Sequence, residues 1–160
     1  MEAKLGHKSD KIEFPFNFSS FGKIVKEYGL GDTVNKLIPF DVDGNYKTTP
    51  QIELIKLIFS ECMGRDDYIY AIDWHHSWFK YNPKINEPYV LYMMYETLED
   101  TKAYFPSFYP NGDYYLFVSQ NFDWGYLTHL WQEKVWVFGE KIVKLMEEKY
   151  QEIGFIKTNE

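Results

Sequence analysis

The sequence predicts an α+β fold: one domain with an antiparallel sheet of about five strands and helices packed mainly on one face. Apolar residues recur at helical spacing near the middle and at the C-terminal end of the chain, and between those segments the period changes to two. The 160 residues fit one ordinary domain, and because 45% of them are hydrophobic we expect a substantial core.

The N-terminal region carries the weakest structural signal. Residues 1–11 are polar, so we expect a loose tail followed by a single domain over residues 12–156. Residues 19–31 predict a short helix, because a serine can cap it and its apolar residues share one face: Phe21, Ile24, Val25 and Tyr28.

Two further helices have clear boundaries. Thr49 is a good N-cap for the first of them, Pro50 suits its first position, and Gly64 ends it. The second begins at Glu140 and ends at Gly154. In both, the apolar residues form one stripe, as in a helix packed on a core.

Five stretches between these helices predict strands. Residues 67–74 alternate between two faces, and residues 76–81 continue that strand or form another. Residues 89–95 are apolar on both faces, as a central covered strand would be, and strands are also predicted at 113–119 and 134–138.

The composition limits the class of partner. A net charge of −7 repels a phosphate backbone, so we expect no nucleic-acid binding. The acidic charge suits a basic protein partner, although its simpler role is to keep the chain soluble. No apolar stretch is long enough to cross a membrane, and the N-terminal residues do not form a secretory signal. With one cysteine, Cys62, no internal disulfide is possible. We therefore expect a cytoplasmic monomer or small homo-oligomer without a cofactor.

Histidines and carboxylates are the residues that could carry chemistry, because the standard phosphate-loop, nucleophile and zinc motifs are absent from the sequence. A carboxylate can orient an imidazole or raise its basicity, and imidazoles bind zinc. The catalytic candidates are His76, His129, Asp73 and Asp113. The metal-ligand candidates are Asp73, His75, His76 and His129. Hydrogen bonding of each histidine to the backbone or to a carboxylate is the simpler interpretation, and we favour it.

Aromatic residues make up 20% of the chain, and the tryptophans all fall in the region of the predicted strands. Tryptophan and tyrosine are enriched at binding hot spots because they combine a large contact area with a polar group. The alternative is that these rings fill the core between sheet and helices. As candidate binding residues we name Trp74, Trp78, Trp124 and Trp131, with Trp136 in the same constellation.

Three stretches are distinctive: "AIDWHHSWFKYNP", "FYPNGDYYLFVSQNFDWG" and "THLWQEKVWVFGEKIV", within roughly residues 66–145. Together they resemble an uncharacterised bacterial family, domain-of-unknown-function family 2716. The matching residues are Asp73, Trp74, His76, Pro83, Pro110, Gly112, Asp113, Tyr114, Tyr115, Gly125, His129, Trp131, Phe138 and Gly139. Leu130 and Gln132 depart from the pattern, where proline and glutamate are expected, and His75 is particular to this chain.

The resemblance implies no activity, because the family has none assigned. An acidic, aromatic-rich chain is similar in character to bacterial immunity proteins, which neutralise toxins by binding them. The leading hypothesis is therefore a non-enzymatic protein-binding domain. The alternatives are a metal-dependent hydrolase, whose site requires His76 and His129 to converge, and a carbohydrate or small-ligand binding protein.

Overall fold

The structure, a computed structural model, describes residues 2–5, 25–31, 49–73, 77–85, 91–93, 101–103, 106–109, 115–129 and 133–158. These residues form an α+β fold, as predicted. Its elements in chain order are β1 (Glu2–Leu5), β2 (Val25–Leu30), α2 (Pro50–Glu61), β3 (Ile69–Asp73), β4 (Ser77–Tyr81), β5 (Leu91–Met93), β6 (Thr101–Ala103), β7 (Tyr115–Ser119), β8 (Gly125–His129), β9 (Lys134–Phe138), α3 (Glu140–Ile153) and β10 (Phe155–Lys157).

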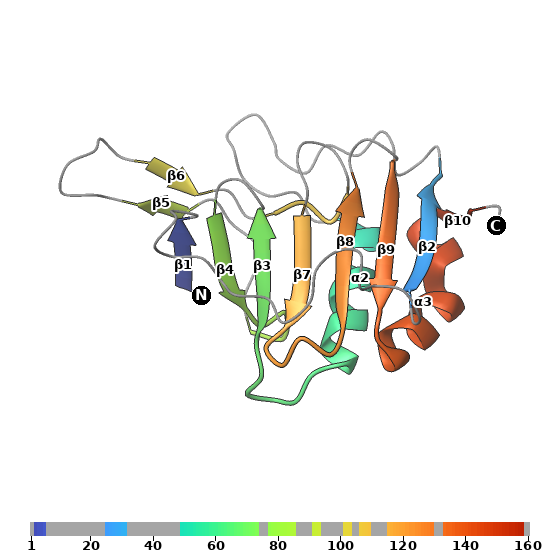
Figure 1. Ribbon diagram of the computed structural model, residues 1–160, viewed down its shortest axis with the longest axis horizontal. Helices are drawn as coiled ribbons and strands as arrows, with labels where there is room; N and C mark the ends of the chain where they lie inside the picture. The colour runs from blue at the N-terminus through green and yellow to red at the C-terminus, as the bar shows by residue number, and fades with distance from the viewer. Residues whose placement is uncertain are drawn as a thin grey trace.

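The main sheet is antiparallel throughout and larger than expected. Eight of the described strands lie in the order β1-β4-β3-β7-β8-β9-β2-β10, instead of the predicted five or so (Figure 1). Strand β5, predicted as a central covered strand, instead pairs with β6 in a separate two-stranded sheet, so that prediction was wrong. Its apolar run is as typical of a short hairpin as of a buried strand.

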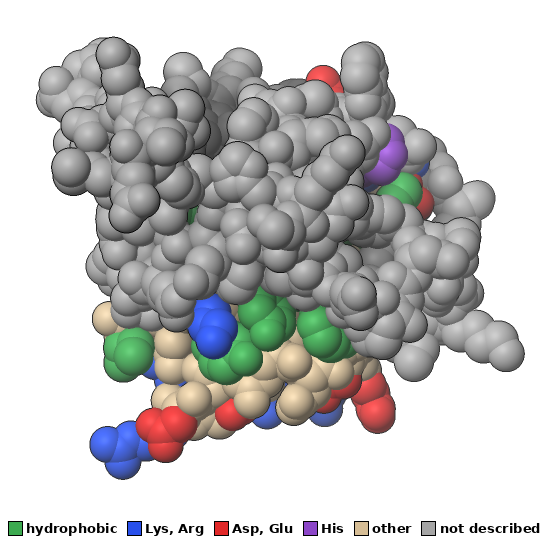
Figure 2. Space-filling view, turned by 60° about the vertical axis from the view of Figure 1, so that its left-hand side comes forward, with side chains coloured by type: hydrophobic (Ala, Val, Ile, Leu, Met, Phe, Trp, Pro, Cys, Tyr) green, Lys and Arg blue, Asp and Glu red, His purple; other side chains and the backbone are tan. Residues whose placement is uncertain are grey.

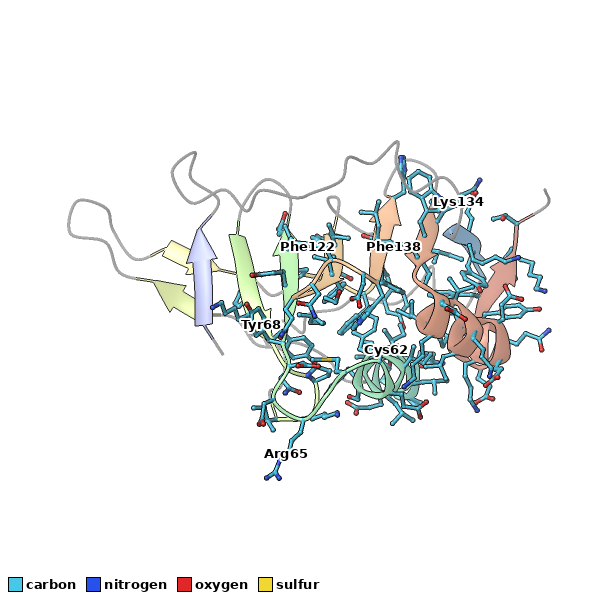
Figure 3. The ribbon with its side chains drawn as sticks, turned by 60° about the horizontal axis from the view of Figure 1, so that its bottom comes forward. Cys62, Arg65, Tyr68, Phe122, Lys134 and Phe138 are labelled. Atoms are coloured by element: carbon cyan, nitrogen blue, oxygen red, sulfur yellow. The ribbon has the colours of Figure 1, made fainter. Side chains whose placement is uncertain are left out.

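Both described helices cover the same face of the main sheet, which confirms the predicted layering (Figures 1 and 3). Phe59 of α2 lies at the centre of the core between the helices and the sheet. Its ring centroid is 5.4 Å from those of Phe117 and Tyr126 and 5.6 Å from that of Trp124. Large aromatic side chains thus fill the space between helix and sheet, which accounts for part of the aromatic content.

The helix ends follow the predicted local chemistry. The Thr49 hydroxyl accepts a hydrogen bond from the Ile52 backbone N–H at 3.2 Å, which caps α2, and Pro50 is its first residue. Gly154 ends α3 with φ of 95°, the left-handed conformation that favours glycine. Neither helix of the described chain is long and apolar enough to cross a membrane.

The N-terminal prediction was wrong at two places. Val25–Leu30, predicted as part of a helix, is strand β2, which pairs with β9 on one side and β10 on the other. Residues 2–5, expected in a loose tail, form the edge strand β1 beside β4. Pairing with strands distant in sequence overrides the helical spacing of a short segment, and local patterns do not contain that information.

The sheet face opposite the helices is also buried at its centre. Ile72, Leu116, Val118 and Leu127 form a second cluster there, each at most 6% exposed. We refer to this side as the second face. The central strands β3, β7 and β8 therefore have apolar residues on both sides, as expected for strands covered on both faces.

Three residues that carry the family resemblance have steric roles. A Cβ on Gly125 would lie 2.6 Å from Cζ of Phe138 and closer still to its Cε1, so glycine lets the ring cross the neighbouring strand. Gly139 has φ of 107°, and a Cβ there would lie 2.5 Å from Cβ of Trp124. Glycine is therefore required at both positions: at Gly125 so that β8 can lie beside the Phe138 ring of β9, and at Gly139 so that α3 can begin directly after β9.

Candidate functional site

Two of the predicted site residues, Asp73 and His129, lie at the same end of the main sheet. Asp73 is the last residue of β3 and is the cross-strand partner of Tyr115 in β7. Tyr115 is in turn the partner of Thr128 in β8, one residue before His129. Along the strand direction the two side chains are therefore level to within a residue.

The sheet nevertheless separates Asp73 from His129. Asp73 alternates with Ile69 and Ala71, whose side chains belong to the core under the helices. His129 lies against Trp136, which packs on the second face. Because the two side chains project from opposite faces, they do not form one acid–base or metal-binding site.

The other candidates are only partly testable. Trp74, His75, His76, Asp113 and Trp131 lie outside the described residues, and only the backbone of Trp78 is described. The convergence of His76 with His129 thus stays a prediction. Within the described ranges, no three His, Cys, Asp or Glu side chains are grouped as metal ligands.

Trp124 is part of the core, although we predicted it as a binding residue. Its side chain is 8% exposed and packs against Phe59, and its backbone approaches Gly139. The Ser119 hydroxyl accepts hydrogen bonds from the backbone N–H groups of Asp123 and Trp124, which fixes the turn between β7 and β8. Trp124 therefore offers little area to a partner.

His129 and Trp136 mark the strongest candidate surface. Their ring centroids are 4.9 Å apart with an interplanar angle of 54°. The cross-strand partner of His129 is Lys134, which forms an ion pair with Glu27 of β2. Trp136 is itself the cross-strand partner of Glu27, so these four half-buried side chains occupy adjoining positions on the second face.

The same row of strand partners continues to the edge of the sheet. Lys134 pairs with Gly29 of β2, and Gly29 pairs with Ile156 of β10. Ile156 is 55% exposed, and its Cγ1 would be 3.1 Å from a Cβ on Gly29, so the isoleucine lies over the glycine. We call the set Glu27, His129, Lys134, Trp136 and Ile156 the Trp136 surface.

Sequence reasoning found only part of this surface. It identified His129 and Trp136 but did not pair them, because residues 125–129 were not recognised as a strand. Had β8 and β9 been read as a hairpin, the alternation would have placed both rings on one face. Ile156 and Glu27 join them through β2 and β10, whose placement depends on long-range pairing.

A second aromatic group lies near the other end of the second face. The Tyr68 and Tyr70 hydroxyls are 3.2 Å apart, and the Tyr70 ring stacks on Phe122 with centroids 5.8 Å apart. Lys80 Nζ lies 4.9 Å from the Tyr68 ring centroid. Burial raises the pKa of Tyr70 to about 12, so its hydroxyl stays protonated at neutral pH. These rings are half-buried against the sheet.

Charge is nearly balanced over the described part of the chain. It holds almost as many Lys and Arg as Asp and Glu, so most of the net charge of −7 belongs to the remaining residues. Figure 2 shows acidic and basic side chains interspersed along the lower border of the described surface. Overall charge therefore does not single out the Trp136 surface, which holds one ion pair.

Comparison with known proteins agrees with the resemblance found in the sequence. The family profile for "Protein of unknown function (DUF2716)" matches residues 41–143. An uncharacterized protein of Bacillus subtilis (strain 168), YxiI, is 33% identical over 85 residues, which cover 52% of this chain and 46% of that protein. The match thus spans about half the length of this relative. No solved structure matches the chain.

Proposed function

The chain belongs to the family of proteins of unknown function DUF2716, and we propose that it is a non-enzymatic protein-binding domain that uses the Trp136 surface. Bacterial immunity proteins, which neutralise a toxin by binding it, are the class we favour. In this proposal the partner is a basic protein that meets the chain in the cytoplasm.

The observation that carries the proposal is the half-buried pair of Trp136 and His129, with the exposed Ile156 further along the same row of strand partners. Interface hot spots combine a large aromatic side chain with neighbours that exclude water. Trp136 is fixed by its packing on the second cluster, so it would lose little conformational freedom on binding. Lys134 and Glu27 supply paired charges of the kind found at an interface rim.

The net charge of −7 supports a basic partner. Long-range attraction between an acidic chain and a basic protein raises the association rate, even when the acidic residues lie outside the contact. The aromatic contacts then slow dissociation, which is where most of the affinity is set.

The hydrolase alternative has less support in the described residues. Asp73 and His129 project from opposite faces of the sheet, so neither can orient the other for acid–base chemistry. The small-ligand alternative rests on the Tyr68–Tyr70 group, whose rings contact one another and the sheet.

Site-specific photocrosslinking tests this proposal in bacterial cells that express the full chain. A benzophenone amino acid is placed at Ile156 in one variant and, as the matched control, at Ile85 in another. Ile85 is also exposed, at 77%, but follows β4 near the opposite end of the sheet order. We expect a protein adduct of defined mass at Ile156 and not at Ile85. Equal adducts at both positions, or none at Ile156, would refute the proposed surface.

A further inference from the structure

Helix α2 presents an exposed stripe that contains no basic residue. Only four of its residues are exposed, and they recur every three or four positions: Pro50, Glu53, Leu57 and Glu61. Leu57 is 53% exposed, one of the few large apolar side chains in the described residues that face solvent to this extent. The two glutamates lie one helical turn before and after it. We call Glu53, Leu57 and Glu61 the α2 ridge.

The lysine of this helix forms an ion pair with Glu53 from the inner side of the ridge. Lys56 is 5% exposed, and its Nζ lies 3.3 Å from Oε1 of Glu53. The cation is thus drawn inward along the helix, while the Glu53 carboxylate stays half exposed. Glu61 is the last residue of α2, whose last turn contains no basic residue.

The neighbouring helix α3 provides an internal comparison. Its exposed residues mix both signs, with Lys141 and Lys144 beside Glu140 and Glu148. Such a pattern is typical of a solvated face. On the exposed side of α2, by contrast, an apolar side chain lies between two carboxylates.

We propose that the α2 ridge binds a basic amphipathic helix of a partner protein. Four residues of helix rise about 6 Å, so a partner helix with an apolar residue between lysines or arginines at four-residue spacing matches both carboxylates and Leu57. The charges of the ridge fit a basic and not an acidic helix. This contact lies on the helical face of the sheet and does not depend on the proposed function of the Trp136 surface.

A defined peptide tests the proposal on the full-length chain. The probe is a synthetic helical peptide with leucine flanked at four-residue spacing by lysines, and the control peptide has glutamate in place of lysine. Binding is followed by backbone NMR shifts of the isotope-labelled chain and by titration at low and high salt. We expect shifts concentrated in residues 50–61 with the lysine peptide only, weakening as salt rises.

Variants separate the ridge from non-specific attraction. A double Glu53→Lys, Glu61→Lys variant should bind the lysine peptide about tenfold more weakly, and Leu57→Ala should also weaken it, whereas Ile85→Ala should leave it unchanged. Far-UV circular dichroism confirms that each variant is folded. Shifts centred away from α2, or binding that these substitutions leave intact, would overturn the proposal. The photocrosslinking result at Ile156 is independent of this outcome.

Discussion

Substitution of Gly125 by alanine tests the steric account of the residues that carry the family resemblance. The new Cβ would lie 2.6 Å from Cζ of Phe138, closer than real Cβ atoms approach, and 3.0 Å from the carbonyl oxygen of Phe117, which is a tight contact. The ring must therefore move, and overpacking of this kind costs about 1–3 kcal/mol. Each kcal/mol lowers the melting temperature by roughly 2–4 °C in a chain of this size.

A double-mutant cycle isolates the contact. Phe138→Leu removes the two ring atoms nearest to the new Cβ, so the Gly125→Ala, Phe138→Leu double variant should lose less stability than the sum of the single variants, by about 1 kcal/mol. Urea unfolding of the four proteins, followed by circular dichroism, measures this coupling. Gly139→Ala should also destabilise the fold, but for a different reason, because its φ of 107° and the nearby Trp124 backbone disfavour a side chain there. Additive effects at Gly125 and Phe138 would refute the reasoning.

Three further predictions concern the core and its titrating groups. Phe59→Ala, which removes a ring that contacts four other aromatic rings, should cost about 3–5 kcal/mol in urea unfolding, and a cost below about 1 kcal/mol would contradict the core assignment. The Tyr28 hydroxyl donates to Oε1 of Glu147 at 2.9 Å, and this bond, with the nearby Lys157, holds the pKa of Glu147 below its ordinary value of 4.5. The bond therefore stabilises the folded chain at pH values above 4.5, and this contribution is lost on acidification. Tyr28→Phe should lower the free energy of unfolding by about 1–2 kcal/mol at pH 7, and its stability should fall less steeply toward acidic pH. An identical acid dependence in both proteins would contradict this. Burial raises the pKa of the Cys62 thiol to about 11, so iodoacetamide should label it at pH 8 much more slowly in the folded chain than in urea, and equal rates would be inconsistent with that environment.

The sequence predicts best where local chemistry decides the structure. The helix beginning at Pro50 has a threonine cap, a proline at its first position and one apolar stripe, and all three act within a single turn or face. The helix ending at Gly154 is determined in the same local way. The strand at residues 134–138 follows from alternation alone, with Val135 and Val137 buried under the helices.

Long-range pairing accounts for the errors. Residues 25–30 are held as a strand by β9 and β10, which lie more than a hundred residues further along the chain. Tyr28 fits the predicted helical stripe, but it packs instead with Tyr150 and Phe155. The candidate site depends on the same long-range pairing, because the pairing of β2 with β10 brings Ile156 into the row of strand partners that contains His129.

The affinity of the purified partner for Trp136→Ala tests the central claim most directly. The partner identified by photocrosslinking is titrated calorimetrically with the wild-type chain, with Trp136→Ala and with the control Ile85→Ala, each confirmed to be folded. A hot-spot tryptophan contributes about 2 kcal/mol or more, so we predict that Trp136→Ala weakens binding roughly 30-fold while Ile85→Ala binds as the wild type does. Unchanged affinity of the folded Trp136→Ala chain would contradict the account.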